Sequence, residues 1–106
     1  MKVRNQDKRC ADRCLLCAEI CEQFEKEFKN KSKMIDAVQL AHICAEKCKA
    51  VASNGCKDIH LLEQCAKACK ACATESSKHE GLYALVCTES CLSCAKYCDE
   101  MVVSVG

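Results

Sequence analysis

The chain has 106 residues, which is enough for one domain, residues 1–106, with a modest hydrophobic core. Its 16 Lys and Arg nearly cancel its 15 Asp and Glu, and two Tyr, two Phe and no Trp offer little base stacking, so no nucleic-acid partner is expected. No apolar run is long enough for a signal-peptide core or a membrane span, so we expect a cytoplasmic protein that does not enter a membrane.

Helix-forming residues dominate the chain, which contains no Pro and only three Gly. The composition predicts helices over residues 6–29, 33–53, 58–76 and 78–102. The connections between these helices are short, and short connections make sequential helices antiparallel neighbours. We therefore predict an all-α fold, an up-down antiparallel four-helix bundle.

Three polar stretches predict the breaks between the helices. Asn30 or Ser32 can cap the start of the second helix. Asn54-Gly55 suits a left-handed turn that ends this helix, and Asp58 can then cap the third. Residues 77–80 have the sequence of a capping box, which predicts the start of the fourth helix.

Fourteen cysteines are the most unusual feature of the sequence. They recur at spacings of four, three and four residues, which places them within about 60° of one another around a helix. The full motif CxxxCxxCxxxC occurs at residues 10–21 and 87–98, and partial copies occupy the second and third helices. Cys56 lies in the second connection, and the other cysteines fall on inward-facing stripes: Cys10, Cys14, Cys17, Cys21, Cys44, Cys48, Cys65, Cys69, Cys72, Cys87, Cys91, Cys94 and Cys98.

The same stripes contain a few residues of other types. Ala37, Ala41 and Ser76 stand where further cysteines of the motif would lie. The remaining inward positions are predicted to hold Phe24, Phe28, Val51, Leu61 or Leu62, Leu82 or Tyr83, and Met101.

Two interpretations of the cysteines require no metal. Free Cys packs as a small hydrophobe, but filling whole stripes with it forgoes the burial that larger apolar side chains supply. A disulfide framework fits poorly, because cysteines four residues apart on a helix have Cβ atoms about 5–6 Å apart, whereas a disulfide prefers about 3.5–4.5 Å. A redox protein that cycles dithiols and disulfides stays open as an alternative.

Thiolates favour Cu(I), Zn(II) and iron–sulfur clusters as ligands. A buried zinc site with four cysteines carries two net negative charges, so several such sites in one core would be costly. Cu(I) paired one to one with thiolate is neutral, and it tolerates two-coordinate binding by cysteines four residues apart. The pattern therefore favours Cu(I), roughly 7–14 ions per chain. A zinc or mixed-metal thiolate buffer of the metallothionein type stays open as a second alternative.

The repeated CxxxCxxCxxxC motifs, with matching cysteine pairs on the two middle helices, resemble those of the four-helix-bundle copper storage proteins, and more closely their cytosolic branch. The resemblance covers essentially the whole chain. It implies a preformed bundle, usually a homotetramer, that stores or buffers many Cu(I) ions through core cysteines. The departures from the motif at Ala37, Ala41 and Ser76 imply a lower capacity than in the richest members.

The two ends of the predicted bundle differ. One end is predicted to be an apolar plug of Phe24, Phe28, Met34, Ile35, Leu40 and Tyr83. The other end collects Cys10, Cys56, His60, Cys98 and Met101. We predict that Cys56, His60 and Met101 form an exposed mouth that passes Cu(I) inward. His42 lies off its stripe and is assigned to the surface, and His79 has no assigned role.

No enzyme is predicted, because the three His lack the motif context of a nucleophile, base and orienting group. The predicted metal ligands are all fourteen cysteines, with His60 and Met101 as further candidates at the mouth. A copper chaperone or an efflux protein is a candidate partner.

Overall fold

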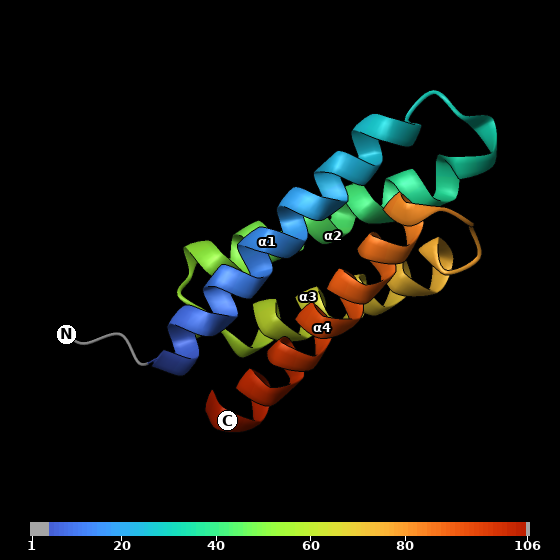
Figure 1. Cartoon of the computed structure of the whole chain (residues 1–106). Helices are drawn as coiled ribbons and strands as arrows, with labels where there is room; N and C mark the ends of the chain where they lie inside the picture. Colours follow the sequence, from blue (N-terminus) through green and yellow to red (C-terminus); the bar gives the residue numbers. More distant parts are fainter. Residues whose placement is uncertain (1–4, 106) are drawn as a thin grey trace.

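A computed structural model describes residues 5–105 of the chain, and the side chains of residues 8–105. It contains α1 (Asn5–Phe28), a short 3₁₀ turn η1 (Ser32–Met34), α2 (Ile35–Ser53), α3 (Ile59–Ser76) and α4 (Leu82–Val105). The described part of the chain has no β-strand. Consecutive helices run in opposite directions, as Figure 1 shows. The predicted all-α four-helix bundle is therefore confirmed.

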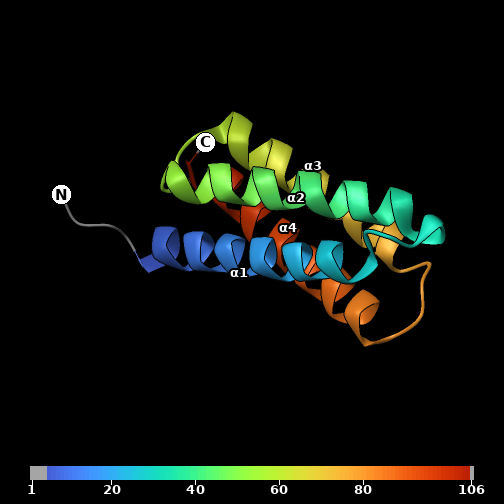
Figure 2. The same cartoon turned by 90° about the horizontal axis from the view of Figure 1, so that it is seen from above.

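Each helix packs against two neighbours: α1 and α3 both contact α2 and α4. The bundle measures 46 × 19 × 19 Å. Figures 1 and 2 show that the start of α1, the α2–α3 connection and the end of α4 meet at one end. We call this end, with Cys10, Cys56, Cys98 and Met101, the cysteine end. The opposite end, with Phe24, Phe28 and Tyr83, is the aromatic end.

The α2–α3 connection forms as predicted. Gly55 and Cys56 have left-handed backbone conformations, with φ of 73° and 60°. Asp58 caps α3, because its side-chain oxygen accepts hydrogen bonds from the backbone amides of His60 (2.9 Å) and Leu61 (3.2 Å). The left-handed conformation of Cys56 is uncommon for a residue with a Cβ, and here it accompanies a fully buried thiol.

The predicted capping box at residues 77–80 is wrong, and α4 begins at Leu82 instead of residue 78. Ser77 is the C-terminal cap of α3, and its hydroxyl donates to the carbonyl of Thr74 at 2.8 Å. The amides of Lys78 and His79 also donate back to α3 carbonyls. Gly81 then turns the chain with φ of 107°. Competition from the C-terminal turn of α3 thus overrides the local capping signal.

The predicted caps at Asn30 and Ser32 are also wrong. The residue before η1 is Lys31, and α2 follows Met34; neither start has a side-chain hydrogen bond. Met34 is buried and its amide bonds to the carbonyl of Lys31 at 2.9 Å. Backbone hydrogen bonds and burial of Met34 therefore hold this turn, in place of a polar cap.

All fourteen cysteines are buried, each with an exposed fraction of 1% or less. The helical stripes are thus confirmed as inward-facing, and Ala37, Ala41 and Ser76 are buried in the same core. The largest side chains buried with the cysteines are Phe24, Leu62, Met101 and Val51. Sulfur and methyl groups fill most of this core, where a bundle ordinarily holds Leu, Ile and Val.

Three of the predicted apolar positions differ in the structure. Leu82 and Tyr83 are exposed, and Ala84 is the residue that continues the inward stripe of α4. Ile35, predicted for the apolar plug, is also exposed. The aromatic contacts of the plug do form: the rings of Phe24 and Phe28 lie 4.9 Å apart, and Phe28 meets Tyr83 edge-on at 6.0 Å.

Candidate metal centre

The helix geometry brings most of the thiols together as four quartets. In each quartet the four sulfur atoms all lie within 4.8 Å of one another. From the cysteine end to the aromatic end, the quartets are Cys14, Cys65, Cys94 and Cys98; Cys17, Cys48, Cys69 and Cys94; Cys17, Cys21, Cys44 and Cys91; and Cys21, Cys72, Cys87 and Cys91. Together they use twelve different cysteines, that is, all except Cys10 and Cys56.

The quartets share members, so they form one continuous chain of sulfur along the bundle axis. Cys94 belongs to the first and second quartets, and Cys17 to the second and third. Cys21 and Cys91 both belong to the third and fourth quartets. Because a thiolate can bridge two metal ions, shared sulfurs allow neighbouring ions to form one cluster instead of separate sites.

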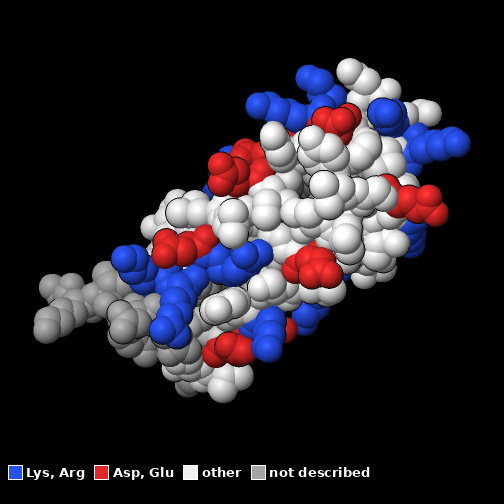
Figure 3. Space-filling view, viewed as in Figure 1, with Lys and Arg blue, Asp and Glu red and all other residues white. Residues whose placement is uncertain are grey.

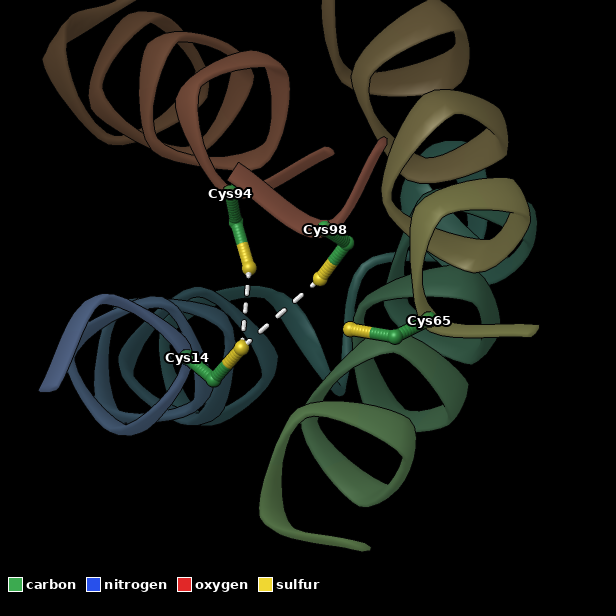
Figure 4. A group of neighbouring side chains, drawn as sticks. All are labelled: Cys14, Cys65, Cys94 and Cys98. Atoms are coloured by element: carbon green, nitrogen blue, oxygen red, sulfur yellow. Dashed lines mark hydrogen bonds between the residues drawn. The ribbon is translucent and has the colours of Figure 1, made fainter. Parts of the chain in front are cut away.

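Sulfurs from different helices face one another in these quartets. Figure 4 shows the first quartet, in which Cys14 of α1, Cys65 of α3 and two cysteines of α4 point into a common space. The Sγ atom of Cys14 lies 3.6 Å from that of Cys94 and 3.8 Å from that of Cys98. The second quartet takes one cysteine from each of the four helices.

The spacing of the sulfurs suits a metal ion without large rearrangement. Ligands about 2.3 Å from a tetrahedrally bound ion lie about 3.8 Å from one another. The hydrogen-bonded sulfur pairs between helices lie from 3.2 Å apart, for Cys44 and Cys69, to 4.0 Å, for Cys17 and Cys44, and the other pairs within a quartet lie within 4.8 Å. These distances are far longer than the roughly 2.05 Å of a disulfide bond, and none of the fourteen cysteines forms a disulfide.

Cys10 and Cys56 stand apart from the quartets, at the cysteine end. Both interact with Cys14, since both contribute to raising the pKa of its thiol. The sequence singled out Cys56 as the exception, but Cys10 shares this status although it belongs to the full motif of α1. The axial offset between the helices excludes Cys10 from the quartets, because no group of sulfur atoms within 4.8 Å of one another includes it.

The predicted exposed mouth is wrong for two of its three residues. Cys56 and Met101 are each only 1% exposed, so neither stands at the surface. His60 is exposed, and its backbone amide donates to Asp58 in the cap of α3. His42 lies on the surface as predicted, and its ring contacts Glu25 at 3.2 Å and Glu46 at 2.7 Å.

The sulfur chain stops before the aromatic end. Beyond the fourth quartet, Phe24, Ala37 and Ala41 fill the core. Ser76 occupies the inward position after Cys72, and its hydroxyl lies 2.6 Å from that of Thr88. A hydroxyl does not supply a thiolate ligand, so the chain of sulfur atoms ends near Cys72 and Cys87.

The thiols affect one another's ionisation. Contacts with neighbouring cysteines, together with burial, raise the pKa of six thiols above the usual value: Cys14, Cys21, Cys48, Cys69, Cys91 and Cys98. Contacts with other cysteines lower the pKa of five thiols: Cys17, Cys44, Cys65, Cys72 and Cys94. The hydrogen bond with Cys14 is the main cause that lowers the pKa of Cys94 to about 7. A metal ion must therefore displace protons from the thiols whose pKa is raised in order to bind them.

We expect the apparent affinity for a thiophilic cation to fall as the pH falls, by about tenfold per pH unit for each proton displaced. Thiols with a raised pKa are protonated at neutral pH, so a cation that binds these thiols competes with protons. Titrations between pH 6 and pH 8, corrected for protonation of the competing chelator, measure this slope. An affinity that does not change with pH would contradict the protonation of these thiols.

Comparisons with known proteins agree with this site. No curated protein sequence matches the chain significantly. The solved structure of a cytosolic copper storage protein from Streptomyces lividans with five coppers has a TM-score of 0.88 and 26% identity, covering 95% of each chain. The same organism's protein loaded with 10 copper equivalents has a TM-score of 0.85 and 27% identity, covering 92% of this chain and 84% of that one.

An apo structure is similar as well. Copper storage protein 3 from Bacillus subtilis in its apo form has a TM-score of 0.81 and 26% identity, covering 90% of this chain and 97% of that one. The sequence profile of the family described as copper storage protein matches residues 2–103. Since this match spans nearly the whole chain, including every cysteine, the chain belongs to the copper storage protein family.

Proposed function

We propose that this member of the family stores Cu(I) along the whole sulfur chain, with all fourteen cysteines as ligands. The observation that carries the proposal is the charge balance of the core. Within residues 8–105, the only fully buried polar side chains are Ser76 and Ser90. Arg13 is half-buried and its guanidinium donates to Ser90 of α4, so no fully buried cationic side chain offsets a negative cluster. One Cu(I) per thiolate leaves the core neutral, and neutrality removes the main cost of burying ionised groups.

Zinc does not achieve this balance. One Zn(II) in each of the four quartets would bring eight positive charges to twelve thiolates, leaving four negative charges in the core. A buried net charge of this size is strongly unfavourable without counterions. A metallothionein-like zinc buffer is therefore the weaker candidate, although the sulfur spacing alone would accept zinc.

A dithiol–disulfide redox function is also weaker. Redox proteins use a defined pair of cysteines, of which one is accessible to its partner. Here the sulfur of Cys44 lies within 4.0 Å of three others, those of Cys17, Cys69 and Cys91, so no single pair is defined. All of the thiols are buried. These features suit shared metal ligands better than a reactive pair.

The proposal extends to the surroundings of the protein. Within the described residues, no helix combines the length and apolar character needed to cross a membrane. The cytosolic relative from Streptomyces lividans supports a cytoplasmic location. The resemblance to the family supports a homotetramer. A copper chaperone or an efflux protein is the candidate partner. The family is one of storage proteins, and we propose that this chain likewise is not an enzyme.

Copper would enter at the cysteine end. Cys10 and Cys56 lie there, outside the quartets and next to Cys14 of the first one. They can bind an arriving ion with two ligands and pass it to Cys14. His60 stands exposed on the first turn of α3, and Met101 is buried at the same end; both are proposed to assist this transfer.

Metal competition tests the proposal. We expect the reduced protein, saturated with Zn(II) in the absence of oxygen, to bind at most about four zinc ions and to release them when one equivalent of Cu(I) per cysteine is added. Zinc in solution is followed with a chromophoric chelator, and copper on the chain by elemental analysis after gel filtration. Retention of zinc under these conditions would favour the metallothionein-like alternative and overturn copper storage.

A further inference from the structure

All four sulfur quartets depend on how α1 and α4 lie against each other. Every quartet contains at least one cysteine of α1 and one of α4, whereas α2 and α3 are each missing from at least one quartet. The cysteines that belong to two quartets are also confined to these two helices: Cys17 and Cys21 on α1, and Cys91 and Cys94 on α4. The axial offset between α1 and α4 therefore decides whether the sulfur chain is continuous.

No connection of the chain sets this offset directly. Short connections join α1 to α2, α2 to α3 and α3 to α4, whereas α1 and α4 lie side by side with the two other helices between them in the sequence (Figure 1). Within residues 8–105, ion pairs between helices join α1 to α2 or α3 to α4, and none joins α1 to α4. Figure 3 looks onto these two helices and shows a broad area without charged groups between scattered acidic and basic ones. The offset must therefore be held by contacts in the seam between α1 and α4.

Arg13 of α1 makes such a contact with Ser90 of α4. Its Nη2 nitrogen donates to the hydroxyl of Ser90 at 2.6 Å and to the backbone carbonyl of Ser90 at 3.1 Å. Arg13 is half-buried, and Ser90 has an exposed fraction of only 5%. Within residues 8–103, these are the only hydrogen bonds between α1 and α4 that do not join two sulfur atoms. Because one of the two bonds ends on a carbonyl, Arg13 holds the backbone of α4 and not just a side chain.

The contact lies level with the shared sulfurs. Arg13 is one helical turn before Cys17, and Ser90 is directly before Cys91 and one turn before Cys94. The sulfurs of Cys17 and Cys91 lie 3.9 Å apart. A slip of α4 by one residue along α1 would displace these sulfurs by about 1.5 Å, which is large beside a metal–sulfur bond of about 2.3 Å. A small change of offset would thus separate sulfurs that have to bridge the same ions.

Placing Arg13 in the seam has a cost. Its Nε nitrogen is buried and has no hydrogen-bond partner, and a buried unpaired donor is destabilising. Within residues 8–105, no carboxylate forms an ion pair with Arg13. An apolar side chain would fill the same space without this cost, but it could not hold the backbone of α4.

We propose that Arg13 is a positioning residue for the copper cluster. Its bonds to Ser90 set the axial offset at which sulfurs of α1 and α4 bridge neighbouring quartets. The inference rests on the proposed storage of Cu(I) along the sulfur chain. Arg13 binds no copper itself, and it acts by keeping Cys17 level with Cys91 and Cys94.

X-ray absorption at the copper edge tests this role on the full chain, saturated with Cu(I) in the absence of oxygen. Scattering of one copper by another arises from ions that lie close together, as they do when they share a sulfur. We expect copper–copper scattering in the wild-type chain and a signal at least about twofold weaker in Arg13→Met, whose side chain cannot donate to Ser90. The copper capacity of Arg13→Met should also fall by about three ions or more. Unchanged helical circular dichroism would show that the variant remains folded.

Ser90→Ala and Ser76→Ala form a matched pair of variants. Each removes one buried hydroxyl that lies 2.6 Å from its partner on a neighbouring helix. Ser90→Ala removes one of the two bonds from Arg13 and should weaken the copper–copper scattering in part. Ser76→Ala acts between α3 and α4, which a short connection already joins, and should leave the scattering unchanged. Arg13→Met combined with Ser90→Ala should be no worse than Arg13→Met alone, because both changes remove the same contact.

Three results would overturn the role of Arg13. Full scattering and full capacity in Arg13→Met would show that the offset is held without this residue. A loss in Arg13→Met with none in Ser90→Ala would assign the effect to the positive charge instead of the hydrogen bonds. An equal loss in Ser76→Ala would show a general loosening of the bundle. Absence of copper–copper scattering in the wild-type chain would overturn the shared-sulfur cluster itself, so the wild-type sample separates failure of copper storage from failure of this inference.

Discussion

Anaerobic titration of the reduced chain with Cu(I) should end at about 12 to 14 ions per chain, close to one ion for every cysteine. The four quartets share Cys17, Cys21, Cys91 and Cys94, so bridging sulfurs can join their ions into one cluster. Neutrality of the core also requires about one Cu(I) per thiolate, because no cationic side chain within residues 8–105 is fully buried. The end point is read against a chromophoric Cu(I) chelator, with the chelator alone as the blank.

Two lower end points would have distinct meanings. An end point of about four ions would mean one ion per quartet, and it would contradict the continuous cluster. An end point of one or two ions would fit a copper chaperone and would contradict storage. The capacity therefore distinguishes between functions that the fold alone does not separate.

Removal of shared cysteines should reduce the capacity far more than removal of the same number of unshared ones. Cys17 and Cys91 together belong to the second, third and fourth quartets. We expect Cys17→Ala with Cys91→Ala to lose about six ions or more, because the remaining thiols of three quartets lose their bridges. Titration to the same chelator end point measures the loss.

Cys10→Ala with Cys56→Ala is the matched control for this double variant. It also removes two buried thiols, but neither belongs to a quartet. It should lose no more than about two ions and should load more slowly, since these residues are the proposed entrance. Equal losses in the two double variants would show that the quartets do not act as a connected unit. Unchanged helical circular dichroism would show that both variants remain folded.

The secondary structure could largely be predicted from the sequence, and the errors fall at the caps. Asp58 caps α3 as its position indicates, because nothing competes for the amides of His60 and Leu61. Residues 77–80 carry an equally good local signal, yet the amides of Ser77, Lys78 and His79 are bonded to carbonyls at the end of α3. Caps depend on which of two neighbouring helices uses a given amide, and a local pattern does not settle that competition.

The exposure of the predicted mouth could not be derived in the same way. Cys56 lies in a connection, where residues are usually exposed, but two successive left-handed residues turn its thiol into the core. Met101 is the last fully buried residue of α4, and its neighbours cover it at the cysteine end. Whether a residue near the end of a helix is covered depends on how far the other helices extend.

The sequence by itself determined the nature of the core. A spacing of four, three and four residues keeps each cysteine on one side of its own helix, whatever surrounds it. It follows from this that thiols line the interior and that a monovalent soft cation balances them best. Only the tertiary structure decided which thiols meet, including the sharing of Cys94 between two quartets and the separation of Cys10 from all of them. Periodicity fixes the direction of a side chain around its helix axis, whereas the axial offset between helices is set by connections and packing across the bundle.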